Sequence, residues 1–577
     1  MKTNFKKIVS TLALAATFAA LPLAGCASGG TGGKKELPKD KTIIRLLCYD
    51  AGYGRTYVEK VAREFEKVQA EHSYEAGKKG VYFDITQSPT AAVGAEVLTG
   101  LPNSDVDMFF SDGHTAVELQ KNGYVMDITK LVKASSKDET PISPFAGETS
   151  IYDRMYDDYR DYVTTKEGAV YNVPLFLMTY NLTYDVDLMK ENKLYIRKDS
   201  TDEKLNLTGD VTQASAGVDG VAGTEDDGLP ETYAQFLLWM EKMTNNTTPM
   251  HYQGGMLMRA MSNFWADFEG KEGTKACYTF DGTKLTDLVD KVNDDGSVTY
   301  LPETAITTEN GYLVQRQEGR LRVLQLMEKI AASMKTSNGY VYKKKFPSVD
   351  NHKQAQTTYL VSSQNDPKPI LMFAEGGYWE TEASATFSKM GGNTKRNFAI
   401  LPTPKYSRAE VGKDSRRTVW SEFGGEIFLR KGVAEQVNAQ AVTDFFLYYN
   451  SEENMAIQNR EASQPRPFEY SIDSIKSTMS NYQISLYNML HSDRTDVVFA
   501  GDSNDFTVAN TDQISNYYWL LYSNYDVSSD EAAYTPVQIM YERGATAKTF
   551  FEGLERVYTK KVGAQSKWDE MLGRISQ

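Results

Sequence analysis

The sequence AVYNVPLFLMTYNLTYDVDLMKENK, at Ala169–Lys193, decides how this chain crosses between its parts. Its apolar run Val173–Met178 contains Pro174, which has no backbone N–H and would break a helix. The run is therefore predicted to be extended, and the segment after it has the composition of a helix. Three tyrosines supply amphipathic rings that suit either packing or a wet cleft, namely Tyr171, Tyr180 and Tyr184.

Strands and helices alternate ahead of this stretch. Thr42–Cys48 is a strand-like apolar run, and apolar residues at helical spacing follow it, Val58, Val61, Ala62, Phe65 and Val68. Further strands are predicted at Val81–Thr86 and Asp105–Ser111, with a helix at Pro89–Thr99 between them. Such alternation favours a parallel α/β sheet, whose loops after the strand ends face a ligand crevice. Tyr53 and Asp112 are therefore expected at the edge of a cleft.

A second informative stretch is KPILMFAEGGYWETEASATF at Lys368–Phe387. An apolar strand runs into a glycine pair, and glycine lets the backbone approach other groups closely. Tyr378 and Trp379 follow the pair and are expected to be displayed rather than buried. Downstream, WSEFGGEIFLR at Trp420–Arg430 carries another glycine pair inside an apolar run.

The first 26 residues have the pattern of a lipoprotein leader. A basic start and a short apolar run precede Leu23-Ala24-Gly25-Cys26. The run is shorter than the ~20 apolar residues that a membrane span needs, which favours a signal peptide over residues 1–25. Leu-Ala-Gly-Cys looks like a bacterial lipobox, which implies cleavage before Cys26 and lipidation of its thiol. The Gly/Ser/Lys-rich residues 26–40 are expected to be a flexible tether.

In this order along the chain, these stretches resemble the extracellular solute-binding proteins (family 1) of sugar ABC transporters. The resemblance implies an α/β fold of the two-lobe, periplasmic-binding-protein type (type II, Venus-flytrap), with crossing hinge strands. It places lobe 1 at 41–178 and 425–475, and lobe 2 at 179–424 and 476–577. The implied function is a lipid-anchored, extracytoplasmic, monomeric protein that captures a carbohydrate, an oligosaccharide, and delivers it to the permease subunits of an ABC importer.

A sugar packs its C–H face on an aromatic ring while its hydroxyls need fixed polar groups. Trp379 is the favoured ring, because glycines precede it and the resembled family keeps a Trp there. For each candidate, structural packing is the competing interpretation. The full candidate set is Tyr53, Asp112, Trp265, Tyr378, Trp379, Trp420, Glu422 and Arg466.

Composition and motifs exclude several other functions. The formal net charge of −14 supplies no basic face for nucleic acid. The five histidines are far apart, and no catalytic or phosphate-binding motif occurs, so an enzyme is not expected. Two alternatives stay open: the same fold binding a non-sugar solute, and a surface glycoside hydrolase. Whether Cys48 and Cys277 pair or remain buried free thiols is also open.

No cofactor is required by this interpretation, but one loop raises the question of a metal. Residues 197–228 are polar, and Asp219, Asp226 and Asp227 are interspersed with glycines. Hard cations such as Ca²⁺ take several oxygen ligands from flexible turns. The spacing does not match the EF-hand, and a solvated acidic loop is the competing interpretation.

Overall fold

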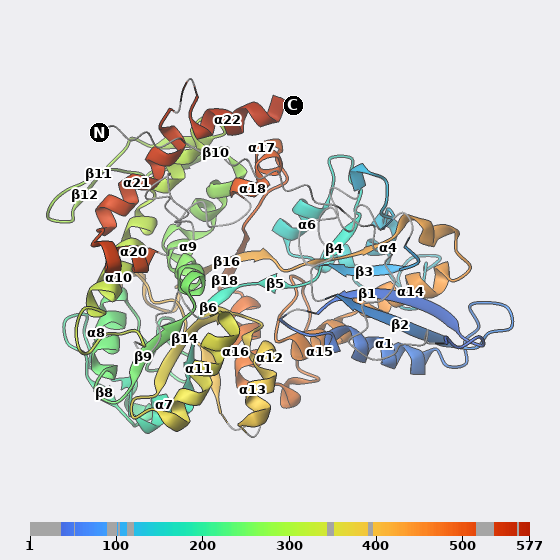
Figure 1. The fold of residues 1–577 in the computed structure, drawn as a ribbon, viewed down its shortest axis with the longest axis horizontal. Helices are drawn as coiled ribbons and strands as arrows, with labels where there is room; N and C mark the ends of the chain where they lie inside the picture. Colours follow the sequence, from blue (N-terminus) through green and yellow to red (C-terminus); the bar gives the residue numbers. More distant parts are fainter. Residues whose placement is uncertain are drawn as a thin grey trace, which may run out of the picture.

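The computed structural model describes residues 36–50, 52–88, 101, 104–111, 120–342, 351–390, 396–514, 536–561, 563 and 565–576. The chain forms two lobes that meet at a narrow central junction (Figure 1). The N-terminal leader with Cys26, the helix predicted at Pro89–Thr99, and Asp112 lie outside the described residues.

Each lobe is built on its own β-sheet, and a third small sheet lies between them. The strands are β1 (Thr42–Tyr49), β2 (Val81–Ser88), β3 (Met108–Ser111), β4 (Asn172–Pro174), β5 (Leu177–Met178), β6 (Tyr180–Asp185), β7 (Tyr195–Ile196), β8 (Leu207–Thr208), β9 (Thr248–Tyr252), β10 (Asp281–Leu285), β11 (Val289–Val292), β12 (Val298–Tyr300), β13 (Thr304–Thr307), β14 (Ile370–Gly376), β15 (Phe398–Ile400), β16 (Arg417–Phe423), β17 (Glu426–Leu429) and β18 (Thr495–Phe499).

Helices cover the sheets and fill most of the second lobe (Figure 1). They are α1 (Thr56–Val68), α4 (Thr129–Val132), α5 (Ile151–Arg154), α6 (Asp157–Val163), α7 (Val186–Glu191), α8 (Tyr233–Met243), α9 (Gly254–Thr279), α10 (Glu318–Ser333), α11 (His352–Asn365), α12 (Trp379–Glu382), α13 (Ser384–Lys389), α14 (Ala439–Tyr449), α15 (Glu452–Ala462), α16 (Asn481–Leu490), α17 (Asp505–Ala509), α18 (Thr511–Ile514), α20 (Pro536–Arg543), α21 (Ala547–Thr559) and α22 (Lys567–Gly573).

The first lobe carries a five-stranded sheet in the order β2-β1-β3-β17-β4. β1 is parallel to β2 and β3, while β17 is antiparallel to both β3 and β4. Burial alternates along β1, as expected for a strand with one face on the core. α1 buries the apolar stripe that its sequence predicted, including Val58, Val61, Ala62 and Phe65. These elements share one hydrophobic core.

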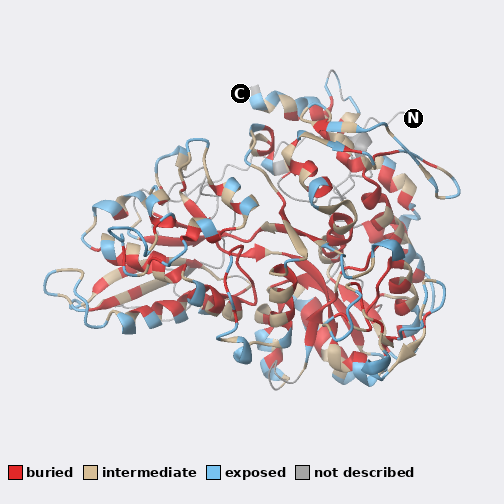
Figure 2. Ribbon diagram, turned by 180° about the vertical axis from the view of Figure 1, so that it is seen from behind, coloured by how far each residue is buried: buried red, intermediate tan, exposed pale blue. Residues whose placement is uncertain are grey.

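The second lobe carries a four-stranded sheet in the order β15-β6-β14-β9. All seven residues of β14 are buried, because helices pack against this sheet (Figure 2). The long helix α9 breaks its helical geometry at Gly270, which has a φ of 68°. Two further strand pairs extend this lobe, β10 with β13 and β11 with β12, and so do the C-terminal helices α20–α22. Their apolar residues join the main core of the lobe.

The junction is a three-stranded sheet in the order β18-β16-β5. Glu422 of β16 pairs with Met178 of β5 in antiparallel register. A Cβ on Gly424 would lie 2.7 Å from the carbonyl oxygen of Phe176, so only glycine allows the two crossing segments to approach this closely. The predicted extended crossing at Val173–Met178 and the two-lobe α/β fold with crossing hinge strands are confirmed.

Two smaller findings complete the fold. Cys48 and Cys277 are both buried free thiols, and each belongs to the core of a different lobe. In the part of the chain that the structure describes, no helix combines the length and the hydropathy needed to span a membrane.

Candidate functional site

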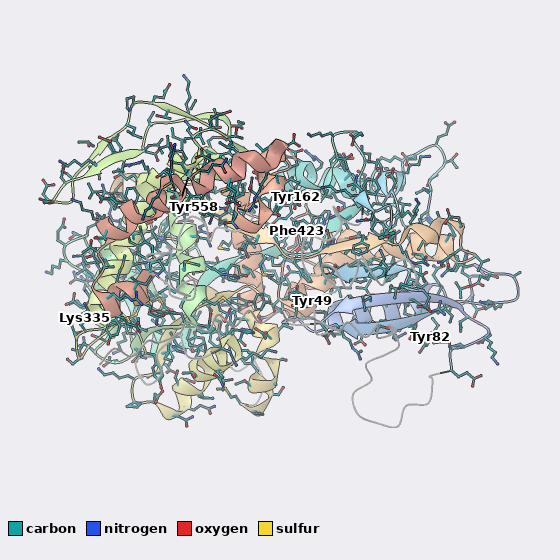
Figure 3. All side chains as sticks on the ribbon, turned by 45° about the horizontal axis from the view of Figure 1, so that its top comes forward. Tyr49, Tyr82, Tyr162, Lys335, Phe423 and Tyr558 are labelled. Carbon is teal, nitrogen blue, oxygen red and sulfur yellow. The ribbon has the colours of Figure 1, made fainter. Side chains whose placement is uncertain are left out.

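The carboxyl ends of the parallel strands of both lobes face the junction. In the first lobe, β1 ends at Tyr49 and β3 ends at Ser111, which pairs with Glu426 of β17. In the second lobe, the parallel strands β9 and β14 end at Tyr252 and Gly376, and Gly376 pairs with Tyr180. Figure 3 shows that Tyr49, Tyr162 and Phe423 lie at the junction, whereas Tyr82 and Lys335 lie at the outer ends of the lobes. Ligands of open α/β sheets bind at such edges, so the junction is the candidate site.

Two tyrosines, one from each lobe, contact each other across the junction. The ring of Tyr53, from the loop after β1, lies 6.3 Å from the ring of Tyr378, centroid to centroid, in an edge-to-face arrangement. Tyr53 also packs edge-on against Phe176 of the crossing segment at 4.8 Å. The loop turns at Gly52, whose φ of 80° suits glycine and whose ideal Cβ position is 3.7 Å from the Tyr378 ring. The two lobes are therefore in aromatic contact beside the hinge.

Arg259 of α9 brings a positive charge to the same place. Its guanidinium carbon lies 4.5 Å from the centre of the Tyr180 ring, and it donates a hydrogen bond to the Tyr180 hydroxyl. An Arg259 nitrogen is 3.9 Å from a carboxylate oxygen of Glu422. The side chains of Arg259 and Glu422 are only 17% and 18% exposed. Together they place a donor and an acceptor, both partly shielded from water, next to a tyrosine face.

Two buried polar side chains line the glycine turn behind Tyr378. Glu375 accepts a hydrogen bond from the Gly376 N–H at 3.0 Å, while its other oxygen has no partner among the described residues. Burial raises the pKa of Glu375 to about 7. Gln464 donates to the Met178 sulfur at 3.3 Å, and a Cβ on Gly377 would lie 2.3 Å from its amide oxygen. Glu375 and Gln464 thus support the turn that carries Tyr378.

Three of the sequence-predicted site residues come together in this arrangement. Tyr53 is buried at the edge of the lobe 1 core, with 3% of its surface exposed, and Tyr378 and Glu422 are partly exposed. Arg259 is absent from the candidates predicted from the sequence. The signal that could have found it is its place as the one Lys, Arg, Asp or Glu in the apolar and aromatic stretch 248–265. A charge is rarely kept in such a stretch unless it meets a partner.

Four other predicted residues lie in the core and take no part in this arrangement. Trp379 has no exposed surface, because the first turn of α12 directs its ring into a cluster of five aromatic rings, so the prediction that it is displayed at a cleft wall is corrected. Trp265 and Trp420 are buried against each other at 5.1 Å, edge to face. Arg466 is fully buried and donates to Asn450 at 2.7 Å and to the Pro174 carbonyl at 2.7 Å. Arg466 thus holds the crossing segment from inside, and burial lowers its pKa to about 10.

The acidic loop is held by its own hydrogen bonds. Asp226 accepts from the Asp219 N–H at 3.1 Å, and Asp227 accepts from the Gly223 N–H at 2.7 Å. Asp219 forms an ion pair with Arg494 at 3.0 Å. Among the residues that the structure describes, no group of three or more His, Cys, Asp or Glu side chains is arranged to hold a metal ion. Both interpretations of this loop, a calcium site and a solvated acidic loop, stay predictions.

Comparison with known proteins identifies one family. A family model described as bacterial extracellular solute-binding protein matches residues 61–460. A comparison with curated protein sequences finds no match. Among solved structures, a chitin oligosaccharide binding protein aligns with a TM-score of 0.47 and 12% identity, covering 90% of this chain and 98% of its own. The apo-form of RafE from Streptococcus pneumoniae has a TM-score of 0.45 and 13% identity, with coverage of 90% and 98%. The GacH receptor of Streptomyces glaucescens GLA.O has a TM-score of 0.46 and 14% identity, with coverage of 91% and 100%.

Proposed function

The chain belongs to the bacterial extracellular solute-binding protein family, and we propose that the solute it captures between its lobes is a carbohydrate. The observation that carries the proposal is the cluster at the junction, where Tyr53 and Tyr378 from opposite lobes adjoin Tyr180, Arg259 and Glu422. Rings offer flat faces to the C–H surface of a sugar, while a guanidinium and a carboxylate can hydrogen-bond its hydroxyls.

The charge of the cluster favours a neutral ligand. Arg259 and Glu422 carry opposite charges at 3.9 Å and balance each other. Burial raises the pKa of Glu375 to about 7, so this nearby carboxyl is protonated in a good fraction of molecules at neutral pH. A strongly charged solute would meet no matching excess charge here, whereas an oligosaccharide needs none. A non-sugar solute, such as a peptide or polyamine, is the second candidate that the test below separates.

The wider role follows from the family and the leader sequence. We propose that the mature protein begins at Cys26, is held extracytoplasmically at the cell membrane by lipid on that thiol, and hands its ligand to the permease subunits of an ABC importer. We further propose that it acts as a monomer and releases the carbohydrate unhydrolysed. A micromolar affinity, about −8 kcal/mol, suffices for such capture.

The test is a calorimetric titration with a panel of neutral oligosaccharides, a peptide and a polyamine. At least one oligosaccharide should bind, and the Arg259→Met variant should bind it about 10–100-fold more weakly, because hydrogen bonds to charged groups contribute about 1.5–3 kcal/mol. Arg416→Met is the matched control, since Arg416 forms a surface ion pair with Asp496. This control should bind as the wild type does.

Other results have distinct meanings. Binding of the peptide or polyamine alone would overturn the carbohydrate proposal while leaving the family intact. Release of reducing ends from the bound oligosaccharide would contradict the assignment as a pure binding protein. Equal affinity of wild type and Arg259→Met for the sugar would show that the ligand lies elsewhere.

A further inference from the structure

A second hollow lies on the outer side of lobe 2, away from the junction. It has a volume of about 670 Å³, within the range of about 300–1,000 Å³ that small-molecule sites occupy. It opens at the amino ends of β9 and β14, whose opposite ends face the junction. β9 is five residues long and spans roughly 13 Å from its first to its last Cα at 3.3 Å per residue, so its two ends lie well apart. Lys335, two residues before the lining residue Ser337, lies far from Tyr49, Tyr162 and Phe423 in Figure 3.

Hydrogen bonds between segments fix the walls of this hollow. The Lys368 ammonium donates to the Thr244 carbonyl at 2.6 Å, joining the segment before β14 to the end of α8. The Tyr342 hydroxyl donates to Asp366 at 2.9 Å, joining the segment after α10 to the same wall. The Tyr342 N–H also donates to the Met250 carbonyl of β9 at 2.9 Å. The hollow is therefore largely preformed, which lowers the entropy that a ligand must lose on binding.

Four side chains that line the hollow take no part in the hydrogen bonds that fix its walls. Asn245, Asn246, Ser337 and Asn338 make no side-chain hydrogen bond within the described part of the chain. Three carboxamides and one hydroxyl offer both donors and acceptors at the mouth of the hollow. Their neighbours Thr244 and Thr247, by contrast, direct their hydroxyls to helix carbonyls at 2.7 and 3.0 Å.

The charges in the lining cancel. Among the described lining residues, Asp366 is the one acid and Lys368 the one base, and both are already engaged with protein groups. An anion would compete with the Thr244 carbonyl for Lys368, and a cation would compete with the Tyr342 hydroxyl for Asp366. A ligand of many neutral hydroxyl groups meets neither obstacle. Tyr342 and Val341 are buried and line the hollow from its protein side.

We propose that this hollow is a second, peripheral binding site for a neutral saccharide, distinct from the junction between the lobes. Asn245, Asn246 and Asn338 bind its hydroxyls, and the hydrogen-bonded walls hold the shape of the site. A site on the outer side of lobe 2 stays accessible whatever the junction holds, so it can retain a glycan chain near the protein while the junction takes up a soluble ligand.

The test places a reporter at the hollow. Lys335 is exposed, and Lys335→Cys in a Cys26→Ser chain is labelled with an environment-sensitive dye. Cys48 and Cys277 are buried and do not react, and the Cys26→Ser chain treated identically gives the background. The labelled protein is titrated with maltotriose, raffinose and triacetylchitotriose. We expect a saturable fluorescence change with at least one of them.

Variants assign the signal to the hollow. Replacing Asn245, Asn246 and Asn338 together by Ala should weaken the response at least tenfold, and all three are exposed, so the fold should persist. Gln213→Ala, which removes an exposed amide outside the hollow, should change nothing. Arg259→Met, in the junction, should also leave the response intact, so a failure of the junction proposal and a failure of this one are distinguishable.

Three results would overturn the proposal. The first is no saturable change with any of the three saccharides. The second is a response that survives the triple Ala substitution. The third is a response lost in Arg259→Met, because the dye would then report on the junction rather than on the hollow.

Discussion

Replacing Trp379 by Ala should destabilise the protein strongly and leave ligand affinity unchanged. The Trp379 ring is fully buried, with centroids of five aromatic rings between 5.1 and 5.9 Å away, those of Tyr359, Phe373, Phe387, Phe398 and Tyr482. Truncating a buried aromatic side chain to Ala costs about 3–5 kcal/mol. Favourable ring pairs add about 0.5–1.5 kcal/mol each beyond area burial. The loss should therefore lie at the upper end, about 4–5 kcal/mol.

Urea unfolding followed by far-UV circular dichroism measures this loss in the absence of ligand, and calorimetry on the same variant measures affinity. Trp379→Phe keeps a ring in the cluster and should lose only about 1–2 kcal/mol. Val437→Ala, at a side chain that is 79% exposed, should stay within about 0.5 kcal/mol of the wild type. An unchanged urea midpoint in Trp379→Ala together with weakened saccharide binding would refute the reasoning, because the ring would then be a cleft wall.

Three further outcomes are expected. The full-length protein should partition into the detergent phase and Cys26→Ser should not, because the substitution removes the thiol of the lipobox; equal partitioning would contradict lipidation. A calcium chelator should leave the wild-type melting temperature unchanged, because the carboxylates of Asp219, Asp226 and Asp227 already accept protein hydrogen bonds; a drop that is absent from the triple Asn variant would establish a metal site. Burial raises the pKa of Glu375 from 4.5 to about 7. The stability that comes from this raised pKa is therefore complete below about pH 4.5 and is lost as the pH rises through about 7. Glu375→Gln cannot titrate, so its urea midpoint should fall less over that pH range than the wild-type midpoint does.

Local patterns were sufficient to predict the fold of the described residues. Pro174 excludes a helix at the crossing segment, and the strand β5 follows it. The apolar stripe of α1 has helical spacing, and the apolar run that forms most of β14 is short and ends at a glycine pair, as a buried strand does. The glycine pair at Gly424-Gly425 marks a close backbone approach, and the structure shows that approach at 2.7 Å from the Phe176 carbonyl.

The candidate site was harder to predict, because burial depends on contacts distant in sequence. Trp379 follows two glycines, but the chain enters a helix at that residue and turns the ring inward, while Tyr378 remains partly exposed. Arg466 was predicted to contact the ligand because it is charged. Its guanidinium instead donates a hydrogen bond to the carbonyl of Pro174, some three hundred positions earlier in the chain. Adjacent residues thus take opposite roles, and sequence spacing alone cannot assign them.

The origin of the junction residues bears on how a ligand would act on the fold. Tyr53 comes from lobe 1, Arg259 and Tyr378 come from lobe 2, and Glu422 lies on the strand that crosses between them. A ligand that contacts Arg259 alone would have the same affinity whatever the position of lobe 1. A ligand that also touches Tyr53 binds best when the lobes are close, and it shifts the lobe equilibrium by exactly its difference in affinity for the two arrangements. In this structure the two lobes already make an edge-to-face contact beside the hinge, between Tyr53 and Tyr378 at 6.3 Å. We therefore expect capture to depend on the ring that lobe 1 supplies as well as on the polar groups of lobe 2.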